Sequence, residues 1–575
     1  MLDFSALKKN LKKDTAGLKK VKLALLGDSA TQFIVQAIKG MGIEYSLDLD
    51  IFESDFNQID RQILDPGSEL YLFDAGAIVI FESTHKLLQK YNKVAPTERR
   101  SFAEKSFLHT KELLSTLQNK SNAKVIFCNY TEENDHVFGQ YANKVEESFI
   151  YQLRKLNFLI QELSSLTSNM FILDLSTIQN SIGKDNFWAP SIYINTEMVV
   201  SVEALPYFAQ YVIQIISAFQ GSFIKCVILD LDNTVWGGII GDDGIENIQI
   251  GQLGIGKAYT EFQHWIKKLQ QRGIILAICS KNTESVAREP FEKHPDMVLQ
   301  LSDIAVFMAN WDNKVDNIRK IQRILNIGFD SMVFLDDNPF ERNIVRENIK
   351  GIIIPELPED PALYLDYLYG LNLFETISYS GEDTQRTRQY QKDAERAVLQ
   401  ESFTNEDDFL KSLEMRSDTK SFDSFTIPRI AQLSQRSNQF NLRTVRYTED
   451  DIRRIAGSGD YLTRSFTLED KFGDNGLICA IIMKKKSDTV LFIDTWFMSC
   501  RVLKRGMENY VLNTIIYMAK HYGFSTIVGE YVPTAKNQMV SDHYLNLGFE
   551  SRNGLWKLEV QTYVEKENFI TKIDK

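Results

Sequence analysis

Two acidic residues stand two positions apart after a short apolar run. The motif VILDLDNTVWGG occupies residues 227–238, so Asp230 and Asp232 follow the run Cys226–Leu229. The run predicts a buried strand, and parallel α/β sheets bind ligands beyond the carboxyl ends of their strands. In phosphoryl transfer, Asp230 would attack phosphorus, while Asp232 would protonate the leaving oxygen and then activate water. The structural alternative is a helix-capping pair, because Asp, Asn and Thr all cap helices.

Three later segments supply partners for this pair. Ser280 follows the next apolar run and offers a hydroxyl to a phosphate oxygen, and Lys314 adds a cation that would neutralise a transferring group. Asp336 and Asp337 end a further run, and a bound Mg²⁺ would relieve their mutual repulsion. A surface lysine and a turn before a proline are the alternatives for these last two features. Only 50 residues separate Asp230 from Ser280, and 34 separate Ser280 from Lys314, so we expect an open site without a lid domain.

The remaining pattern predicts a multidomain α/β protein. A chain of 575 residues exceeds the size at which one core stops growing, roughly 250–300 residues. We expect α/β domains at 1–220 and 221–375, because apolar runs alternate there with helical patterns and so favour parallel sheets. A charged helical linker at 376–425 and an α+β domain at 426–575 would follow. The runs predicted as strands in the first two domains are Lys22–Leu26, Ala77–Phe81, Lys124–Cys128, Met170–Leu173, Cys226–Leu229, Ile274–Ile278 and Met332–Leu335.

The last block is rich in β-type runs around one long helical pattern. Leu477–Met483, Val490–Met498 and Thr526–Gly529 predict strands, and Arg505–His521 predicts a helix. A helix laid on an antiparallel sheet is typical of α+β folds.

Composition restricts the class of protein further. The formal charge of −12 argues against a nucleic-acid partner, because proteins that bind nucleic acids usually carry a basic face. Five scattered cysteines without CxxC spacing argue against a disulfide framework and against a structural zinc site. We see neither a secretory signal nor an apolar run of membrane length, so we expect a cytoplasmic protein with no membrane partner.

The motifs DLDNTVWGGIIGDDG, ICSKN, NWDNK and FLDDNPFER together resemble the FkbH-like branch (subfamily IIIC) of the haloacid dehalogenase superfamily. The resemblance continues through RSNQFNLRT, DKFGDNGL and DTWFMSCRVLKRGME, and it covers about residues 225–550. It implies a capless Rossmann-like phosphatase domain with Asp230 as nucleophile and Asp232 as acid and base. Mg²⁺ would be held by Asp230, the Asp232 carbonyl, and Asp336 or Asp337. The phosphate-binding residues implied are Thr234, Ser280, Lys281, Asn282 and Lys314.

The same resemblance makes the C-terminal block a GNAT-like acyltransferase domain. The pocket residues that it implies are Asn438, Gln439, Asn441, Arg501 and Gly506. The usual RxxGxG pattern reads RVLKRG here, so Lys504 replaces a glycine that permits close backbone approach to a pyrophosphate. Cys500, beside these cations, would be an acyl-thioester nucleophile, and the alternative is a small buried residue at a strand end.

The N-terminal block resembles SGNH-type esterases. The segment LALLGDSATQ places Ser29 after an apolar run, and Asn129 follows another run, where an oxyanion-side residue is expected. The late DxxH base is missing, because KDNFWAPSIY holds Asp185 without a histidine three residues on. We therefore expect a degenerate SGNH- or flavodoxin-like domain that acts as a binding or cap domain. His136 is the remaining candidate base.

Members of the FkbH-like family in polyketide pathways capture a phosphorylated three-carbon acid, remove its phosphates and load the glyceryl unit onto an acyl carrier protein. The resemblance thus implies a Mg²⁺-dependent phosphatase coupled to glyceryl-like acyl transfer. Its partners would be a phosphorylated small molecule and an acyl carrier protein or a CoA thioester. The alternatives are a plain capless phosphatase for a sugar or metabolite phosphate, with vestigial flanking domains, and a non-catalytic scaffold that binds carriers.

Overall fold

The chain folds into two units. The computed structural model describes residues 2–534 and 536–573, and its internal contacts separate a unit up to residue 218 from a unit that begins at Phe219. Each unit has its own hydrophobic core. Within the described ranges, every helix is too short or too polar to cross a membrane.

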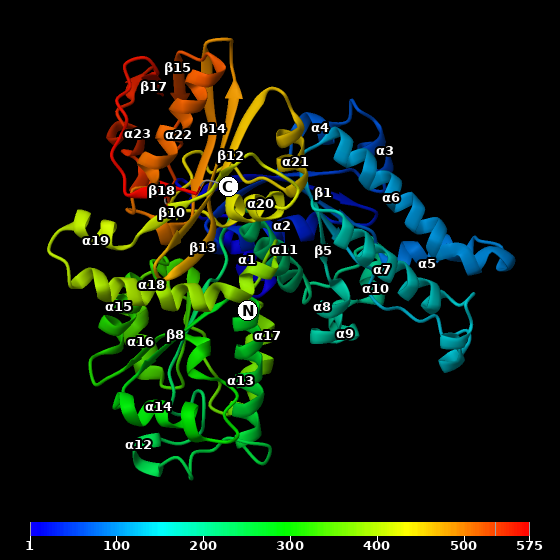
Figure 1. Ribbon diagram of the computed structural model, residues 1–575. Coiled ribbons are helices and arrows are strands. Elements are labelled where there is room, and N and C mark those ends of the chain that lie inside the picture. Colours follow the sequence, from blue (N-terminus) through cyan, green and yellow to red (C-terminus); the bar gives the residue numbers. More distant parts are fainter. Residues whose placement is uncertain (1, 535, 574–575) are drawn as a thin grey trace. The chain divides into compact units, whose positions relative to one another are not determined.

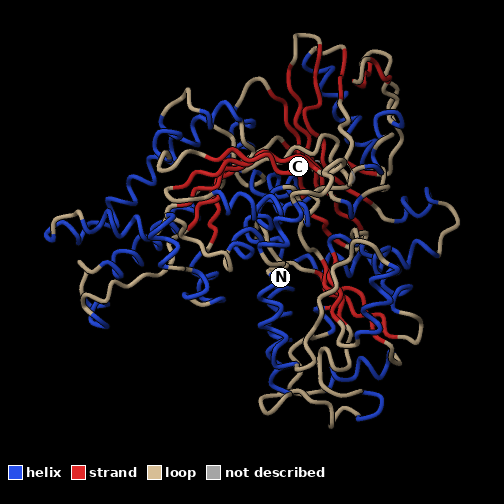
Figure 2. Tube along the Cα trace, turned by 180° about the vertical axis from the view of Figure 1, so that it is seen from behind, coloured by secondary structure: helices blue, strands red, loops and turns tan. Residues whose placement is uncertain are grey.

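A parallel five-stranded sheet organises the first unit (Figure 2, strands in red). Its order, β2-β1-β3-β4-β5, is the flavodoxin-type doubly wound order, in which ligands bind at the switch point between β1 and β3. The strands are β1 Lys19–Gly27, β2 Leu47–Glu53, β3 Ala77–Phe81, β4 Lys124–Cys128 and β5 Met170–Leu173. The helices are α1 Phe4–Asn10, α2 Gln32–Glu44, α3 Ile59–Leu64, α4 Glu69–Phe73, α5 Thr84–Asn92, α6 Phe102–Lys120, α7 Phe149–Leu166, α8 Leu175–Ile182, α9 Lys184–Phe187, α10 Pro190–Thr196 and α11 Leu205–Phe219.

The second unit begins with a parallel four-stranded sheet of order β8-β7-β6-β9. The chain builds outward from β6 through β7 to β8, and then returns to the other side of β6 for β9. This reversal creates a switch point between β6 and β9, and every residue of both strands is buried. The strands are β6 Cys226–Leu229, β7 Ile275–Ser280, β8 Ile304–Ala309 and β9 Met332–Leu335. The helices are α12 Ile240–Asp243, α13 Gly256–Gln271, α14 Glu284–Lys293, α15 Lys314–Leu325, α16 Pro339–Asn348 and α17 Tyr364–Leu371.

A nine-stranded mixed sheet completes the second unit. Its main order is β16-β17-β15-β14-β13-β12-β10-β18, and β11 also pairs with β12. Figure 1 shows α18 between the elements of the four-stranded sheet and this larger sheet. The strands are β10 Met415–Ser417, β11 Thr419–Lys420, β12 Tyr461–Asp470, β13 Gly473–Lys485, β14 Val490–Met498, β15 Thr526–Gly529, β16 Glu550–Arg552, β17 Leu555–Glu559 and β18 Ile570–Lys572. The helices are α18 Arg386–Glu401, α19 Glu406–Ser412, α20 Ile427–Arg436, α21 Glu449–Gly457, α22 Met507–Tyr522 and α23 His543–Asn546.

The apolar runs predicted as strands are confirmed, several of them to the residue. The prediction of a helical linker at 376–425 is wrong at its end, because β10 and β11 lie there and join the large sheet. The prediction of an antiparallel sheet is also wrong, since β14 and β15 are parallel and α22 forms the crossover between them. The strands without a counterpart among the predictions are β2, β8, β10, β11, β12, β16, β17 and β18. In β2 and β12 alternating polar residues weaken the signal.

Candidate active site

The loop after β6 places two acids at the switch point. Asp230 follows the last residue of the strand and is buried, and its backbone N–H donates to the carbonyl of Leu335 in β9 at 2.9 Å. The chain then turns through Asn233, whose φ of 53° lies in the left-handed region that asparagine tolerates. The Asn233 side chain accepts a hydrogen bond from the Gly238 N–H at 2.9 Å. This closed turn fixes the path between Asp230 and Asp232.

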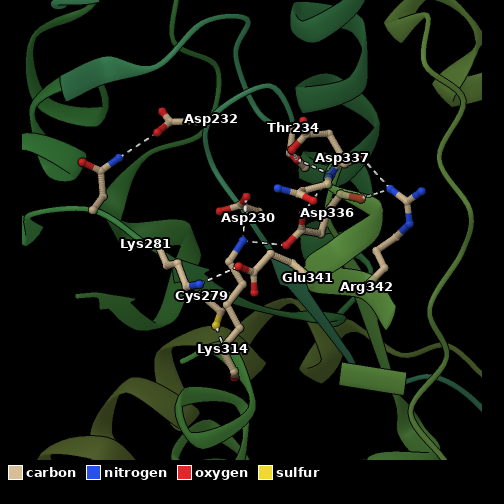
Figure 3. A network of polar contacts seen from close by, with 12 residues as sticks. Asp230, Asp232, Thr234, Cys279, Lys281, Lys314, Asp336, Asp337, Glu341 and Arg342 are labelled. Carbon is tan, nitrogen blue, oxygen red and sulfur yellow. Dashed lines mark hydrogen bonds and ion pairs between the residues drawn. The ribbon is translucent and has the colours of Figure 1, made fainter. Parts of the chain in front are cut away.

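A buried lysine links the acids of two neighbouring strands. The Lys314 ammonium lies 2.8 Å from a carboxylate oxygen of Asp230 and 2.6 Å from one of Asp336 (Figure 3). Only 3% of the Lys314 side chain is exposed. The first turn of α15 carries this lysine, and the side chain of Asn313 caps the helix there. A desolvated cation needs such anionic partners, so the three groups form one electrostatic unit.

The acids of this unit crowd one another. Burial raises the pKa of Asp336, and the negative charge of Asp230 acts in the same direction against the opposing Lys314. Burial and Asp230 likewise raise the pKa of Asp337. Burial alone would lower the pKa of Lys314, but Asp230 and Asp336 raise it above its ordinary value. The cluster therefore holds more negative charge than one lysine neutralises.

The same acids form a donor set for a divalent cation. Asp230, Asp336 and Asp337 each offer a carboxylate oxygen, and these oxygens lie within 4.8 Å of one another. Hard cations such as Mg²⁺ prefer oxygen ligands of this kind. The excess negative charge and the donor chemistry both fit Mg²⁺.

Asp232 does not join this cluster, because its carboxylate points away from Asp230 (Figure 3). One oxygen accepts from the indole N–H of Trp236 at 3.0 Å and from the Ile240 N–H at 3.1 Å, and the other accepts from the Asn282 amide at 2.9 Å. Burial raises the pKa of Asp232 against these hydrogen bonds. Asn282, predicted to bind phosphate, holds Asp232 in this structure.

The other predicted phosphate ligands have varied surroundings. The Thr234 hydroxyl accepts a hydrogen bond from the Asp337 N–H at 3.1 Å and so connects the loops after β6 and β9. Lys281 forms an ion pair with Glu341 at 2.6 Å. Ser280 is the last residue of β7 and is buried at the same edge of the sheet.

Sequence reasoning missed Arg342. Its guanidinium donates to the backbone carbonyls of Asp336 at 2.8 Å and Asp337 at 2.7 Å, and the residue is 5% exposed. Arg342 lies in the first turn of α16, which starts at Pro339, so its side chain reaches back over the loop that carries the acids. An arginine three residues after the proline of a DDNP turn is the signal that would have found it.

The residues around Cys500 form a second candidate region. The segment 440–442 pairs with the end of β14, which leads to Cys500: the Leu442 N–H donates to the Trp496 carbonyl and the Met498 N–H donates to the Phe440 carbonyl. A cavity of about 70 Å³ lies beside this pairing. Its lining includes four of the predicted residues: Asn438, Gln439, Cys500 and Arg501. Asn441 and Gly506 are not in that lining. Asn441 accepts from the Thr444 N–H at 2.8 Å, and Gly506 precedes α22 with a φ of 77°.

Lys504 adopts a left-handed backbone conformation. Its φ is 62°, in the left-handed region that glycine adopts more easily than lysine. Lys504, Arg501 and Cys500 also line a groove of about 390 Å³. Cys500 is thus shared by an inner cavity and an outer groove.

The predicted esterase-type residues of the first unit do not assemble into a triad among the described residues. The Ser29 hydroxyl is buried and has no hydrogen-bond partner there. Asn129 instead donates to Asp174 at 2.7 Å and accepts from the Leu175 N–H at 2.7 Å. His136 is exposed and lines a surface groove whose described lining does not include Ser29.

Another histidine lies nearer to the switch point of this sheet. The Ser83 N–H donates to both carboxylate oxygens of Asp28, at 3.0 and 2.9 Å, and thereby joins the loops after β1 and β3. His85 follows two residues later and stacks on Trp188 with ring centroids 3.5 Å apart. Burial lowers the pKa of His85 to about 4, with Lys184 acting in the same direction. The imidazole is therefore neutral at neutral pH.

Comparison with known proteins identifies two parts of the chain. The family model described as FkbH, N-terminal domain, matches residues 22–217. The solved N-terminal part of the protein BF1531 from Bacteroides fragilis, which contains a phosphatase domain and is complexed with Mg, is 53% identical. The similarity covers 66% of this chain and 100% of that chain, with a TM-score of 0.63. No curated protein matches the chain.

Acetyltransferase structures match a smaller part at much lower similarity. An N-acetyltransferase from Staphylococcus aureus is 12% identical and covers 25% of this chain and 99% of its own, with a TM-score of 0.20. The GNAT domain of S. lividans PAT is 14% identical and covers 24% of this chain and 89% of its own, also with a TM-score of 0.20. Values this low carry no argument about fold or activity.

Proposed function

Because the chain belongs to the FkbH-like family of the haloacid dehalogenase superfamily, we propose that it hydrolyses a phosphorylated small molecule at Asp230 with Mg²⁺ as cofactor. The observation that carries this proposal is the buried cluster of Asp230, Lys314, Asp336 and Asp337 at the switch point of a parallel sheet. The Mg²⁺ in the phosphatase-domain structure from Bacteroides fragilis supports the choice of metal.

The reaction divides between two acids. An oxygen of Asp230 forms a bond to phosphorus as the bond from phosphorus to the leaving oxygen breaks, which gives an aspartyl phosphate. Asp232 gives a proton to the leaving oxygen and then takes one from the water that cleaves the aspartyl phosphate. Its raised pKa suits a group that must be protonated for the first step. To do so, Asp232 exchanges its hydrogen bond from Asn282 for one with the leaving oxygen.

The remaining residues of the site position these groups. Lys314 offsets the negative charge of the nucleophile and of the incoming phosphate. Asp230, Asp336 and Asp337 would hold Mg²⁺, which, when bound, supplies further positive charge against the phosphoryl oxygens. Arg342 fixes the backbone that presents Asp336 and Asp337.

The test is phosphate release by the full chain with Mg²⁺ and a panel of phosphorylated small acids and sugars. Asp230→Asn should lower kcat by more than about a thousandfold, because removal of a covalent nucleophile abolishes the reaction path. Asp242→Asn, which changes an exposed acid in α12, is the matched control and should retain activity. Full activity in Asp230→Asn would refute the proposal.

A second proposed activity is acyl transfer through Cys500, in a GNAT-like domain at 426–575. Its thiolate would attack the acyl carbon of an acyl phosphate or a thioester, so that phosphate or thiol leaves and a protein thioester forms. Cys500 is partly exposed, whereas Cys128, Cys226, Cys279 and Cys479 are buried. That difference in exposure supports Cys500 as the reactive thiol.

The layout of the second unit restricts how the two activities are coupled. Asp230 follows the carboxyl end of β6, while Lys225, which lines the Cys500 cavity, precedes its amino end. Five residues of strand correspond to roughly 16 Å at ~3.3 Å per residue. A small acid bound at Asp230 therefore has to leave that site before it can enter the cavity beside Cys500.

The transferase proposal is tested by intact mass. The full chain is incubated with phosphorylated three-carbon acids, Mg²⁺ and an acyl carrier protein, and wild type is compared with Cys500→Ala. We expect a mass increase on the wild type or the carrier that Cys500→Ala loses. Phosphate release without any adduct would favour the plain capless phosphatase, and absence of both activities would favour the carrier-binding scaffold.

The first unit is proposed to be a degenerate SGNH-like domain that acts as a binding or cap domain and has no catalytic role. The unpartnered Ser29 and the hydrogen bonds that occupy Asn129 support this proposal. Ser29→Ala should leave phosphate release and any acyl transfer unchanged. Loss of an esterase activity in that variant would refute it.

A further inference from the structure

The cavity beside Cys500 is lined by an unusual number of cations. Its walls come from the residue before β6, from α18 and α20, and from the turn after β14. Five of the side chains that line it are cationic: Lys225, Arg386, Arg429, Arg436 and Arg501. No carboxylate is among the described lining residues. A group of like charges around one small space is unfavourable unless an anion shares that space.

Protein anions neutralise only part of this charge. One compensating acid among the described residues is Asp383, which is fully buried and forms ion pairs with both Arg386 and Arg436. Lys225 forms no ion pair with a described residue, and its ammonium donates to the backbone carbonyl of Arg436 at 3.2 Å. Net positive charge therefore remains at the cavity wall.

Several polar atoms of the wall also lack a partner within the described residues. The Arg501 Nη1 and the Arg436 Nε are buried donors without an acceptor. Unpaired buried donors cost free energy, and an oxyanion would satisfy them through charge-assisted hydrogen bonds. Burial lowers the pKa of Lys225 to about 8, with Arg386 and Lys536 acting in the same direction and Cys500 and Asp330 against it.

The size of the cavity limits the ligand. A water molecule needs roughly 10–15 Å³ of such volume, so about 70 Å³ accommodates a group of some five heavy atoms. A tetrahedral phosphate group has this size, and arginine pairs with it through two hydrogen bonds at once. We propose that the cavity is a second anion site, which binds the phosphate group of a small molecule beside the Cys500 thiol.

This site is separate from the cluster around Asp230. The two lie at opposite ends of β6, and they share no lining or cluster residue. The proposal does not depend on phosphatase activity at Asp230. It adds a recognition role for Lys225, Arg386, Arg429 and Arg436, to which the sequence assigned no function.

Protection of Cys500 from iodoacetamide tests the proposal in the full chain. The other four cysteines are buried, so intact mass should record one fast adduct. Inorganic phosphate is added without Mg²⁺, and sodium chloride at equal ionic strength is the reference. At ten times its dissociation constant, a ligand that covers the thiol lowers the alkylation rate about tenfold. Equal rates in phosphate and chloride would overturn the proposal without any variant.

Two variants and a control then locate the effect. Lys225→Met and Arg501→Gln should each weaken protection, because each removes a cation from the wall. Arg388→Gln removes an exposed cation from α18 outside the lining and should protect like wild type. Thermal unfolding shows whether each variant remains folded. Protection that survives in both folded wall variants would also overturn the proposal.

Discussion

Lys314→Met isolates the contribution of the buried lysine to the Asp230 cluster. The variant keeps the length of the side chain and leaves the carboxylates of Asp230 and Asp336 without a cation at 2.8 and 2.6 Å. Removing one member of a buried ion pair costs about 3–5 kcal/mol, and this lysine has two partners. We therefore expect the free energy of unfolding of the second unit to decrease by an amount near the upper end of that range.

Magnesium should return much of that loss. A ligand at one hundred times its dissociation constant adds about 2.7 kcal/mol to the stability of a folded protein. In Lys314→Met the acids carry more uncompensated charge, so Mg²⁺ should stabilise the variant more than the wild type. Urea unfolding with EDTA and with Mg²⁺ measures both quantities in one series.

Lys281→Met provides the matched control. Its ion pair with Glu341 has a similar length of 2.6 Å, but 39% of the Lys281 side chain is exposed, while that of Glu341 is 9% exposed. Because Lys281 is partly solvated and has one carboxylate partner rather than two, this variant should lose less stability than Lys314→Met. Equal losses in the two variants, or an equal response to Mg²⁺ in Lys314→Met and wild type, would show that the buried cluster does not carry the charge imbalance described here.

Three further predictions concern other side chains. Asp232→Asn should slow hydrolysis of alkyl phosphates by about 10²–10⁴-fold and that of p-nitrophenyl phosphate much less, because only the poor leaving group needs a proton; equal losses in steady-state assays would exclude the acid role. Arg342→Leu should raise the Mg²⁺ concentration needed for half-maximal activity, since the Asp336–Asp337 backbone loses its two donors; an unchanged metal titration would refute this. Burial raises the pKa of Asp28 from 3.8 to about 7, so the folded first unit keeps a proton that the unfolded chain releases, and stability falls as pH rises through that window. Between pH 5 and pH 8 this effect lowers the free energy of unfolding by at most about 2.7 kcal/mol, at about 1.36 kcal/mol per pKa unit. Asp28→Asn should abolish that difference in urea unfolding at the two pH values, and an unchanged difference would contradict the prediction.

The sequence predicted the parts of the fold that depend on local apolar runs. Cys226–Leu229 and Met332–Leu335 match their strands to the residue, because each is a continuous buried run. It could not predict β10, whose short run lies in a charged segment and pairs with β18 about 150 residues later. Pairing over that distance leaves no local pattern.

In the candidate site, too, local patterns were predictable from the sequence and long-range contacts were not. The order of Asp230, Lys314 and Asp336 on successive elements was readable, because strand ends of a parallel sheet meet at one edge. The direction of each side chain was not: Asn282 holds Asp232, and Thr234 holds the loop of Asp337. Lys225 could not be identified either, since a lysine before an apolar strand acquires its partners only when α18 and α20 pack beside it.

The position of β6 between two sites has a consequence for intermediates. The cavity beside Cys500 at one end of the strand shares no lining residue with the Asp230 cluster at the other end. If both chemistries occur, a free intermediate mixes with the surrounding solution before it is used, and an unlabelled copy added to the reaction dilutes an isotopic label in the product. An intermediate attached to the flexible arm of a carrier stays with its own molecule and keeps the label. Isotope dilution thus distinguishes a diffusing acid from a tethered one.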